Sequence, residues 1–132
     1  MIQGINHITF AVSDLAASAA FYQQALDAKL LFRDPQTAYF DLAGLWLALN
    51  VQENLPRQEP AYTHIAFTVD QDGLKVMEDR LRRLGIPIKP GRPREAGEGR
   101  SLYFADLDGH LLEVHCGDLK TRLAAYRKNG SG

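Results

Sequence analysis

The stretches GINHITFAV (4–12) and AYTHIAFTV (61–69) decide the fold, because the second repeats the pattern of the first. At one constant offset, the identical pairs are His7 with His64, Ile8 with Ile65, Phe10 with Phe67 and Val12 with Val69. The alternation in both stretches is typical of half-buried β-strands. Successive side chains of a strand point to opposite faces, so each histidine lies on the face away from the apolar stripe. The sequence therefore predicts two equivalent strands with histidines at equivalent places.

A helical pattern follows each predicted strand. In SDLAASAAFYQQALDA (13–28), an apolar stripe runs from Leu15 to Leu26 at helical spacing, and Ser13 is a candidate N-cap. In DQDGLKVMEDRLRRLG (70–85), the stripe consists of Leu74, Met77, Leu81 and Leu84. Gly85 is a candidate C-terminal cap of this second helix.

The residues after the helical patterns also repeat. AYFDLAGLWLALN (38–50) resembles LYFADLDGHLLEVH (102–115), and one inserted residue aligns Tyr39 with Tyr103, Gly44 with Gly109 and Ala48 with Glu113. The prediction is an α+β fold in which one domain, 1–132, holds a βαβββ module at about 1–52, a linker at about 53–60 and a second βαβββ module at about 61–126. A repeat unit cannot bury its core alone, so each module is expected to pack against another.

Composition excludes several classes of protein. The chain has 132 residues, 45% of them hydrophobic and 23% charged, with a net charge of −1, which is ordinary for a globular protein and gives no sign of nucleic-acid or membrane binding. No apolar run approaches the ~20 residues of a membrane span. MIQGINHITFAV has no basic region before its apolar run, so a first strand is expected rather than a signal peptide, and the location is predicted to be cytoplasmic. The single cysteine, Cys116, cannot form an internal disulfide.

Three polar residues fall at corresponding places in the repeat: His7, His64 and Glu113, with Ala48 at the fourth place. If the modules close around a shared groove, two imidazoles and one carboxylate converge, which suits Zn²⁺, Mn²⁺, Fe²⁺ or Ni²⁺ with open positions for substrate. A structural role stays open, because a lone strand histidine is more often packed or solvated and a duplicated ancestor also duplicates an idle histidine. His110 falls on the face opposite Glu113, and His115 is expected at the surface or behind the ligands.

Several segments resemble one family, in order, across nearly the whole chain: NHITFAV, AYFDLAGLWLALN, YTHIAFTV, GEGRSLYFADLDGHLLEVH and GDLKTRLAAYR. They are similar to the vicinal oxygen chelate superfamily, which includes glyoxalase I and extradiol dioxygenases, and most similar to its fosfomycin resistance proteins. The resemblance implies two βαβββ modules in a half-open barrel, paired between the subunits of a homodimer. It also implies an enzyme that opens the epoxide of fosfomycin, and so confers antibiotic resistance, by adding glutathione, bacillithiol, L-cysteine or water.

The same resemblance implies roles for individual residues. The metal ligands would be His7, His64 and Glu113, with His7 supplied by the partner subunit; Mn²⁺ is the metal expected first, ahead of Zn²⁺, Ni²⁺, Fe²⁺ and Mg²⁺. The catalytic residues would be Thr9, near the reacting epoxide oxygen, and Tyr39. The substrate-binding residues would be Trp46, Lys89, Arg94, Ser101, Tyr103 and Arg122. A dianionic phosphonate needs such cationic and hydroxyl donors, although a solvated basic loop is the simpler interpretation of KPGRPREAGEGRSLY (89–103) taken alone.

The nucleophile is predicted from the positions at which this chain differs from the water-adding or the thiol-adding members of the family. RPREAGEGRSLY resembles the water-adding members, but their glutamate base matches Thr37, which cannot accept the proton. Tyr39 resembles the thiol-adding members. The glutathione-adding members carry a potassium-binding loop with a serine where this chain has Gly97, and Arg100 offers a fixed charge instead, so potassium dependence is not assumed. The prediction is a metal-dependent thiol transferase, with a fosfomycin epoxide hydrolase, another glyoxalase-like or dioxygenase-like enzyme, or a metal-free binding protein as alternatives. Cys116 is expected to be inert.

Overall fold

The computed structural model describes residues 1–58 and 61–128, so the last two positions of the predicted linker lie outside the described residues. The chain divides into two compact units. Unit 1 comprises Met1–Pro60 with Asp106–His110, and unit 2 comprises Ala61–Ala105 with Leu111–Gly132. The module boundaries derived from the repeat stay a prediction. The repeat assigns residues 106–110 to the second module, whereas their contacts place them in unit 1.

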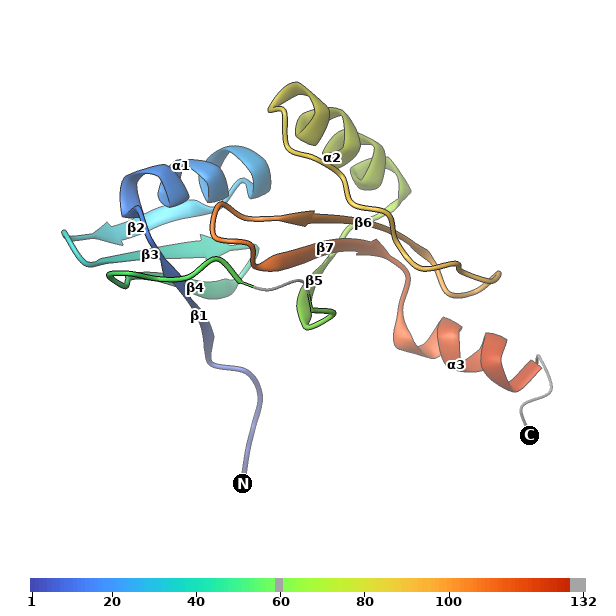
Figure 1. Cartoon of the computed structure of the whole chain (residues 1–132). Helices are drawn as coiled ribbons and strands as arrows, with labels where there is room; N and C mark the ends of the chain where they lie inside the picture. The colour runs from blue at the N-terminus through green and yellow to red at the C-terminus, as the bar shows by residue number, and fades with distance from the viewer. Residues whose placement is uncertain (59–60, 129–132) are drawn as a thin grey trace. The chain divides into compact units, whose positions relative to one another are not determined.

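Unit 1 is an open four-stranded sheet covered on one face by a helix (Figure 1). Its elements are β1 (His7–Val12), α1 (Leu15–Leu26), β2 (Lys29–Arg33), β3 (Thr37–Leu42) and β4 (Leu45–Val51). The sheet order is β1-β4-β3-β2, with β1 parallel to β4 and the other neighbours antiparallel. The predicted stripe of α1 is buried and packs over β3 and β4, which contribute Phe40, Leu47 and Leu49 to the core.

The helix ends confirm one predicted cap and correct the other. Asp14, not Ser13, caps α1: its Oδ1 accepts the backbone N–H of Ala17 at 3.0 Å. The second helix ends as predicted, because Gly85 follows its last residues with a φ of 71° and donates its N–H to the Arg82 carbonyl. Only a residue without a side chain adopts that left-handed backbone at no steric cost.

Unit 2 has the same topology with one strand fewer. Its elements are β5 (His64–Thr68), α2 (Gln71–Arg83), β6 (Arg100–Ala105), β7 (Leu111–Cys116) and α3 (Leu119–Lys128), and its open sheet has the order β5-β7-β6. Where the βαβββ pattern puts another strand, the described residues 86–99 form only an isolated bridge between Lys89 and Tyr103. Three prolines in this segment, Pro87, Pro90 and Pro93, lack the N–H that a ladder requires. The α+β class is confirmed.

Strand registers confirm the alignment of the repeat. Thr9 and Tyr39 both lie beside Ala48, whereas in unit 2 Ala66 and Tyr103 lie beside Glu113. Neighbours directly across a sheet share a face. Ala48 and Glu113 therefore occupy equivalent places, and only the second copy carries a carboxylate there.

The turn Asp106–His110 supplies unit 1 with buried and partly buried polar contacts. Tyr22 donates its hydroxyl to Asp106 Oδ2 at 2.7 Å, and both oxygens of Asp108 accept the backbone N–H of Ser13 at 3.2 Å. His110 donates from Nε2 to the Ala11 carbonyl at 2.8 Å. Burial and the adjacent carboxylate hold the pKa of Tyr22 well above its usual value, so its hydroxyl stays a donor.

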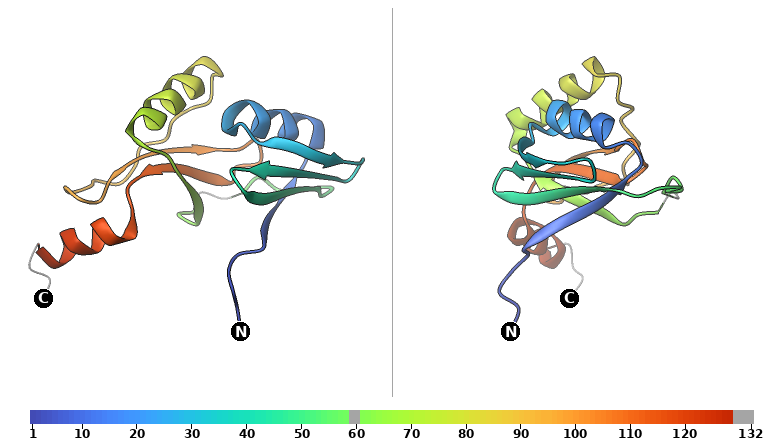
Figure 2. Two further views of the ribbon diagram at one scale, coloured as in Figure 1. Left: turned by 180° about the vertical axis from the view of Figure 1, so that it is seen from behind. Right: turned by 90° about the vertical axis from the view of Figure 1, so that its left-hand side faces the viewer.

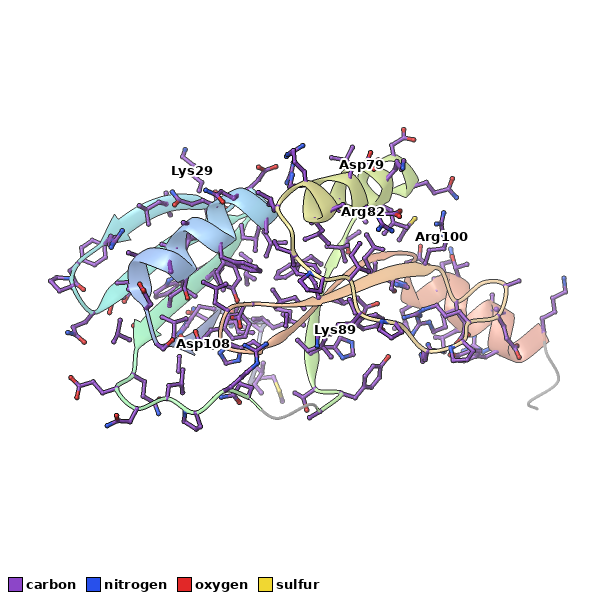
Figure 3. All side chains as sticks on the ribbon, turned by 45° about the horizontal axis from the view of Figure 1, so that its top comes forward. Lys29, Asp79, Arg82, Lys89, Arg100 and Asp108 are labelled. Atoms are coloured by element: carbon purple, nitrogen blue, oxygen red, sulfur yellow. The ribbon has the colours of Figure 1, made fainter. Side chains whose placement is uncertain are left out.

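The outer face of α2 is solvated. Lys75 pairs with Asp79 at 3.1 Å, and Glu78 pairs with Arg82 at 3.0 Å, both at the spacing of one helical turn. Figure 3 shows Asp79 and Arg82 on this helix, and Figure 2 shows α2 from two further sides. Within residues 1–58 and 61–128, the structure contains no helix with the length and apolar character of a bilayer span. The cytoplasmic location stays a prediction.

Candidate metal and anion site

Glu113 is the centre of the candidate site in unit 2. It lies on β7 with only 4% of its surface exposed. One oxygen, Oε1, lies 2.9 Å from His64 Nε2, and the other, Oε2, accepts from Ser101 Oγ and lies 3.3 Å from Arg94 Nη2. Burying a carboxylate is costly unless its oxygens are paired. The register of β5, β6 and β7 brings His64 and Ser101 to this carboxylate, and the loop before β6 brings Arg94.

The donor arrangement at His64 fits a metal ion. Its Nδ1 lies 2.5 Å from the Tyr62 carbonyl, so Nδ1 carries a proton and Nε2 of the neutral ring is left with a lone pair. That lone pair faces Glu113 Oε1, and two acceptors at 2.9 Å need a cation or a second proton between them. A histidine whose outer nitrogen is fixed by a carbonyl is the usual form of a metal ligand.

Unit 1 carries the other candidates on one exposed face. His7 Nδ1 is bonded to Asn6 Oδ1 at 2.7 Å, which again leaves Nε2 available. Its ring lies 4.4 Å, centroid to centroid, from Trp46, and Trp46 lies edge-on to Tyr39 at 5.3 Å. Thr9 is exposed two residues further along β1, on the same face as His7. His7, Thr9, Tyr39 and Trp46 are therefore brought together within unit 1.

The predicted metal ligands divide between the two units. Among residues 1–58 and 61–128, the structure contains no group of three or more His, Cys, Asp or Glu side chains arranged to hold a metal ion. Unit 2 supplies two of the predicted ligands, His64 and Glu113, and the third, His7, belongs to unit 1.

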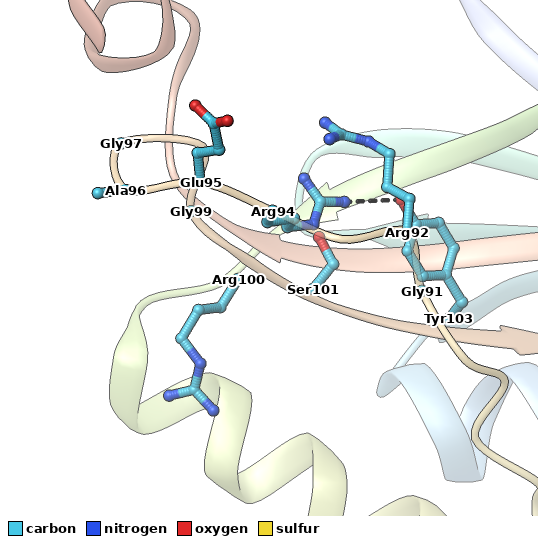
Figure 4. Close-up of a pocket in the computed structure, with 10 residues that line it drawn as sticks. All are labelled: Gly91, Arg92, Arg94, Glu95, Ala96, Gly97, Gly99, Arg100, Ser101 and Tyr103. Atoms are coloured by element: carbon cyan, nitrogen blue, oxygen red, sulfur yellow. Dashed lines mark hydrogen bonds between the residues drawn. The ribbon is translucent and has the colours of Figure 1, made fainter. Parts of the chain in front are cut away.

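Arg94 and two tyrosines form the anion-binding side of the site. Arg94 donates from Nη2 to Tyr103 Oη at 2.8 Å, as Figure 4 shows, and Tyr103 Oη lies 2.9 Å from Tyr62 Oη. Arg94 Nη1 is buried and has no hydrogen-bond partner among the described residues. Burial, with the Tyr62 contact, raises the pKa of Tyr103 to about 12, so it stays a neutral hydroxyl. An unpaired guanidinium nitrogen beside neutral hydroxyls suits an anionic group.

A cavity of about 300 Å³ opens at this cluster. Its walls are Tyr62, His64, Ala66, Arg92, Arg94, Tyr103, Glu113, His115 and Arg122. The sequence did not single out Tyr62, although its position two residues before His64 is a usable signal. His115, expected at the surface or behind the ligands, bonds Ser101 Oγ through Nδ1 at 2.6 Å, and its Nε2 lies 3.4 Å from Arg122. Burial lowers the pKa of His115, which favours the neutral ring.

The basic loop divides among three places. A second cavity, of about 590 Å³, is lined by residues 91–92, 94–97, 99–101 and 103 (Figure 4). Within the loop, Arg92 pairs with Glu98 at 3.0 Å, whereas Arg100 is exposed and extends toward α2 in Figure 4. Lys89 lines a separate groove of about 540 Å³ beside Arg82, so the structure does not bring it to the cavity at Glu113.

Comparison with known proteins places the chain in a family. Residues 4–114 match the family model of the Glyoxalase/Bleomycin resistance protein/Dioxygenase superfamily. The chain is 49% identical over 129 residues to the metallothiol transferase FosB of Lysinibacillus sphaericus, covering 96% of this chain and 92% of that protein. It is 47% identical over 128 residues to the metallothiol transferase FosB of Bacillus licheniformis, covering 96% and 83%.

Solved structures agree with this assignment. The fosfomycin resistance protein FosX of Listeria monocytogenes, complexed with manganese(II) and sulfate, superposes with a TM-score of 0.88 at 41% identity, covering 96% of this chain and 99% of that chain. FosX of Mesorhizobium loti superposes with a TM-score of 0.80 at 36% identity, covering 93% and 99%. The chain belongs to the glyoxalase/bleomycin resistance protein/dioxygenase superfamily and, within it, to the fosfomycin resistance proteins.

Proposed function

We propose that this protein is a metal-dependent transferase that inactivates fosfomycin by adding a thiol to its epoxide ring. The observation that carries the proposal is the juxtaposition of two groups in one cavity. A buried carboxylate faces an imidazole nitrogen at 2.9 Å, and a buried guanidinium nitrogen beside them has no hydrogen-bond partner in the part of the chain that the structure describes. A phosphonate with an adjacent epoxide needs both a cationic centre and an anion pocket.

The metal would be held by His64, Glu113 and His7 of the partner subunit. We favour Mn²⁺, which the FosX of Listeria monocytogenes binds, and retain Zn²⁺, Ni²⁺, Fe²⁺ and Mg²⁺ as alternatives. When bound, the ion polarises the C–O bond of the epoxide and stabilises the developing alkoxide. The two-ligand set of unit 2 supports a homodimer, because a subunit that exposes His7 and Thr9 on one sheet can complete the site of another.

The chain's own residues would bind and orient the substrate. Arg94 Nη1 and the Arg122 guanidinium would take phosphonate oxygens, with the hydroxyls of Tyr62 and Tyr103 as neutral donors. Ser101 would hold the Glu113 carboxylate in place. Thr9 would donate to the ring oxygen as the bond to carbon breaks. A new C–S bond forms, the C–O bond opens, and the proton lost by the thiol ends on the former ring oxygen.

Thr37 supports a thiol rather than water as the nucleophile. Its hydroxyl donates to Asn50 Oδ1 at 2.9 Å, so the position that matches the glutamate base of the water-adding members holds a neutral, committed donor. Water needs a base to lose its proton, whereas a thiol supplies a ready fraction of thiolate. The relatives named metallothiol transferase are also 41–49% identical to this chain. Hydrolysis, suggested by the likeness to FosX, is the alternative.

The test is a product analysis with Mn²⁺ present. The protein is mixed with fosfomycin in separate tubes that contain glutathione, bacillithiol, L-cysteine or buffer alone, and product masses are measured. We expect a thiol adduct with at least one thiol, and none from Glu113→Gln. Glu78→Gln, which neutralises another arginine-paired carboxylate on the outer face of α2, is the matched control. A diol in buffer alone would replace the proposal by hydrolysis, and unreacted fosfomycin in every tube would overturn both.

A further inference from the structure

Glu98 is a buried carboxylate that lines neither of the two cavities. It lies in the loop before β6 and is 6% exposed. A loop carboxylate is normally solvated, and burying one is unfavourable unless donors surround it. Its partners therefore indicate what the burial achieves.

The carboxylate of Glu98 holds the loop on both sides of Arg94. Its Oε1 accepts from Arg92 Nη1 at 3.0 Å, and its Oε2 accepts the backbone N–H of Glu95 at 2.7 Å. Arg92 and Glu95, which lie on either side of Arg94 in the loop, are thus bound to one carboxylate. A hydrogen bond from Tyr126, with that backbone N–H, lowers the pKa of Glu98 to about 2, so the group is ionised wherever the enzyme is assayed.

The same residue connects the loop to α3. Tyr126 Oη donates to Glu98 Oε1 at 2.6 Å, and Arg122 Nη2 donates to the Glu98 carbonyl at 2.9 Å. None of the residues of α3 is buried, and these two polar contacts attach it to the loop. The loop also approaches the helix closely at Gly97, where an added Cβ would lie 2.4 Å from Ala125 Cβ.

We propose that Glu98 is a positioning residue that aligns Arg94 and Arg122 for the substrate phosphonate, with Tyr126 of α3 as its anchor. The inference rests on the proposed function. Glu98 acts through the guanidiniums and does not touch the substrate. It would therefore set the affinity for the phosphonate and leave the chemistry at the metal and the binding of the thiol largely unchanged.

Glu98→Gln tests the inference, because the amide keeps the shape of the side chain and loses its charge. Whichever way the amide turns, an NH₂ group faces a donor, from Tyr126 and Arg92 on one side or from the Glu95 backbone on the other. Binding of methylphosphonate, which carries no epoxide, is measured by calorimetry, and KM and kcat are measured with fosfomycin and the thiol. We expect the Kd for methylphosphonate and the KM for fosfomycin to rise about tenfold. The KM for the thiol and kcat should change less than about twofold.

Two further variants separate positioning from stability. The control variant Glu78→Gln should leave the Kd for methylphosphonate and the KM for fosfomycin unchanged. Tyr126→Phe should weaken phosphonate binding by a smaller factor, and its effect should be less than multiplicative with Glu98→Gln, because both act on one network. A merely structural Glu98 would lower the unfolding temperature and the active fraction without changing the Kd of the folded protein. Tyr126→Phe carries the test if Glu98→Gln does not fold.

The outcomes distinguish this inference from the proposed function. An unchanged Kd for methylphosphonate in Glu98→Gln and Tyr126→Phe overturns the positioning role. Wild-type protein that binds methylphosphonate but does not convert fosfomycin overturns the proposed function and leaves the positioning role standing if the variants weaken binding. Wild-type protein that binds no phosphonate overturns both.

Discussion

Replacing Arg94 by lysine keeps the positive charge and removes the second nitrogen of the fork. In the structure, Nη2 is committed to Tyr103 Oη at 2.8 Å and to Glu113, which leaves Nη1 for the substrate. A lysine ammonium is a single point charge and cannot make both sets of contacts at once. Only 13% of the Arg94 side chain is exposed, so water cannot replace the lost contact fully. One charge-assisted hydrogen bond is worth about 2 kcal/mol, or about 30-fold in affinity.

Steady-state kinetics at saturating thiol and Mn²⁺ measure this effect. The KM for fosfomycin should rise about 30-fold in Arg94→Lys, with a smaller change in kcat. Arg82→Lys is the control, because Arg82 also pairs with a carboxylate but is exposed on α2, where such pairs contribute little. A KM for fosfomycin within twofold of wild type in Arg94→Lys would show that charge alone suffices and that Nη1 does not contact the substrate.

Three other predictions follow from the site. His64→Ala or Glu113→Ala should abolish metal-dependent ring opening while the far-ultraviolet circular dichroism stays that of a folded protein; undiminished turnover in either would refute the ligand assignment. Thr9→Ala should lower kcat more than Mn²⁺ affinity, and a loss of metal with normal turnover per bound metal would contradict that role. Glu98 has a folded pKa of about 2 against a reference of 4.5, so its ionised form stabilises the protein fully above about pH 4.5 and loses that effect as the pH falls toward 2. Urea unfolding of wild type and Glu98→Gln should therefore converge across that range, and a constant difference would show that the charge is not responsible.

Periodicity and the internal repeat were sufficient to predict the α+β fold and the equivalence of Ala48 and Glu113. The reason is physical: strand alternation has a fixed period of two, so an alignment of residue types is also an alignment of faces. The same logic predicts that Glu113 and His115 share a face. The expected strand before β6 is absent from the described residues because Pro87, Pro90 and Pro93 interrupt it, and that signal was available in the sequence.

The contacts that depend on the path of a loop could not be predicted in this way. Glu98 has no periodic context, and a glutamate between two glycines is normally expected in solvent. Its burial follows from the close approach of the loop to Tyr126 and Arg122. Both residues lie on α3, a helix that has no counterpart in the first copy of the repeat. Arg92, rather than Arg100, pairs with the carboxylate of Glu98. The reason is the same, because the backbone path of an irregular loop, and not the spacing of residues in the sequence, sets the direction of each side chain.

The buried turn at Asp106 limits how related proteins of this kind can be recombined. Unit 1 is completed by a segment whose Asp106 lies 84 positions along the chain from its partner Tyr22. A chimaera joined in the linker would take α1 from one parent and this turn from the other. The hydrogen bonds of Tyr22 with Asp106 and of Ser13 with Asp108 would then form only if both parents carry the same pairs of residues. We therefore expect a chimaera to keep its stability when residues 106–110 are transferred together with the first half of the chain.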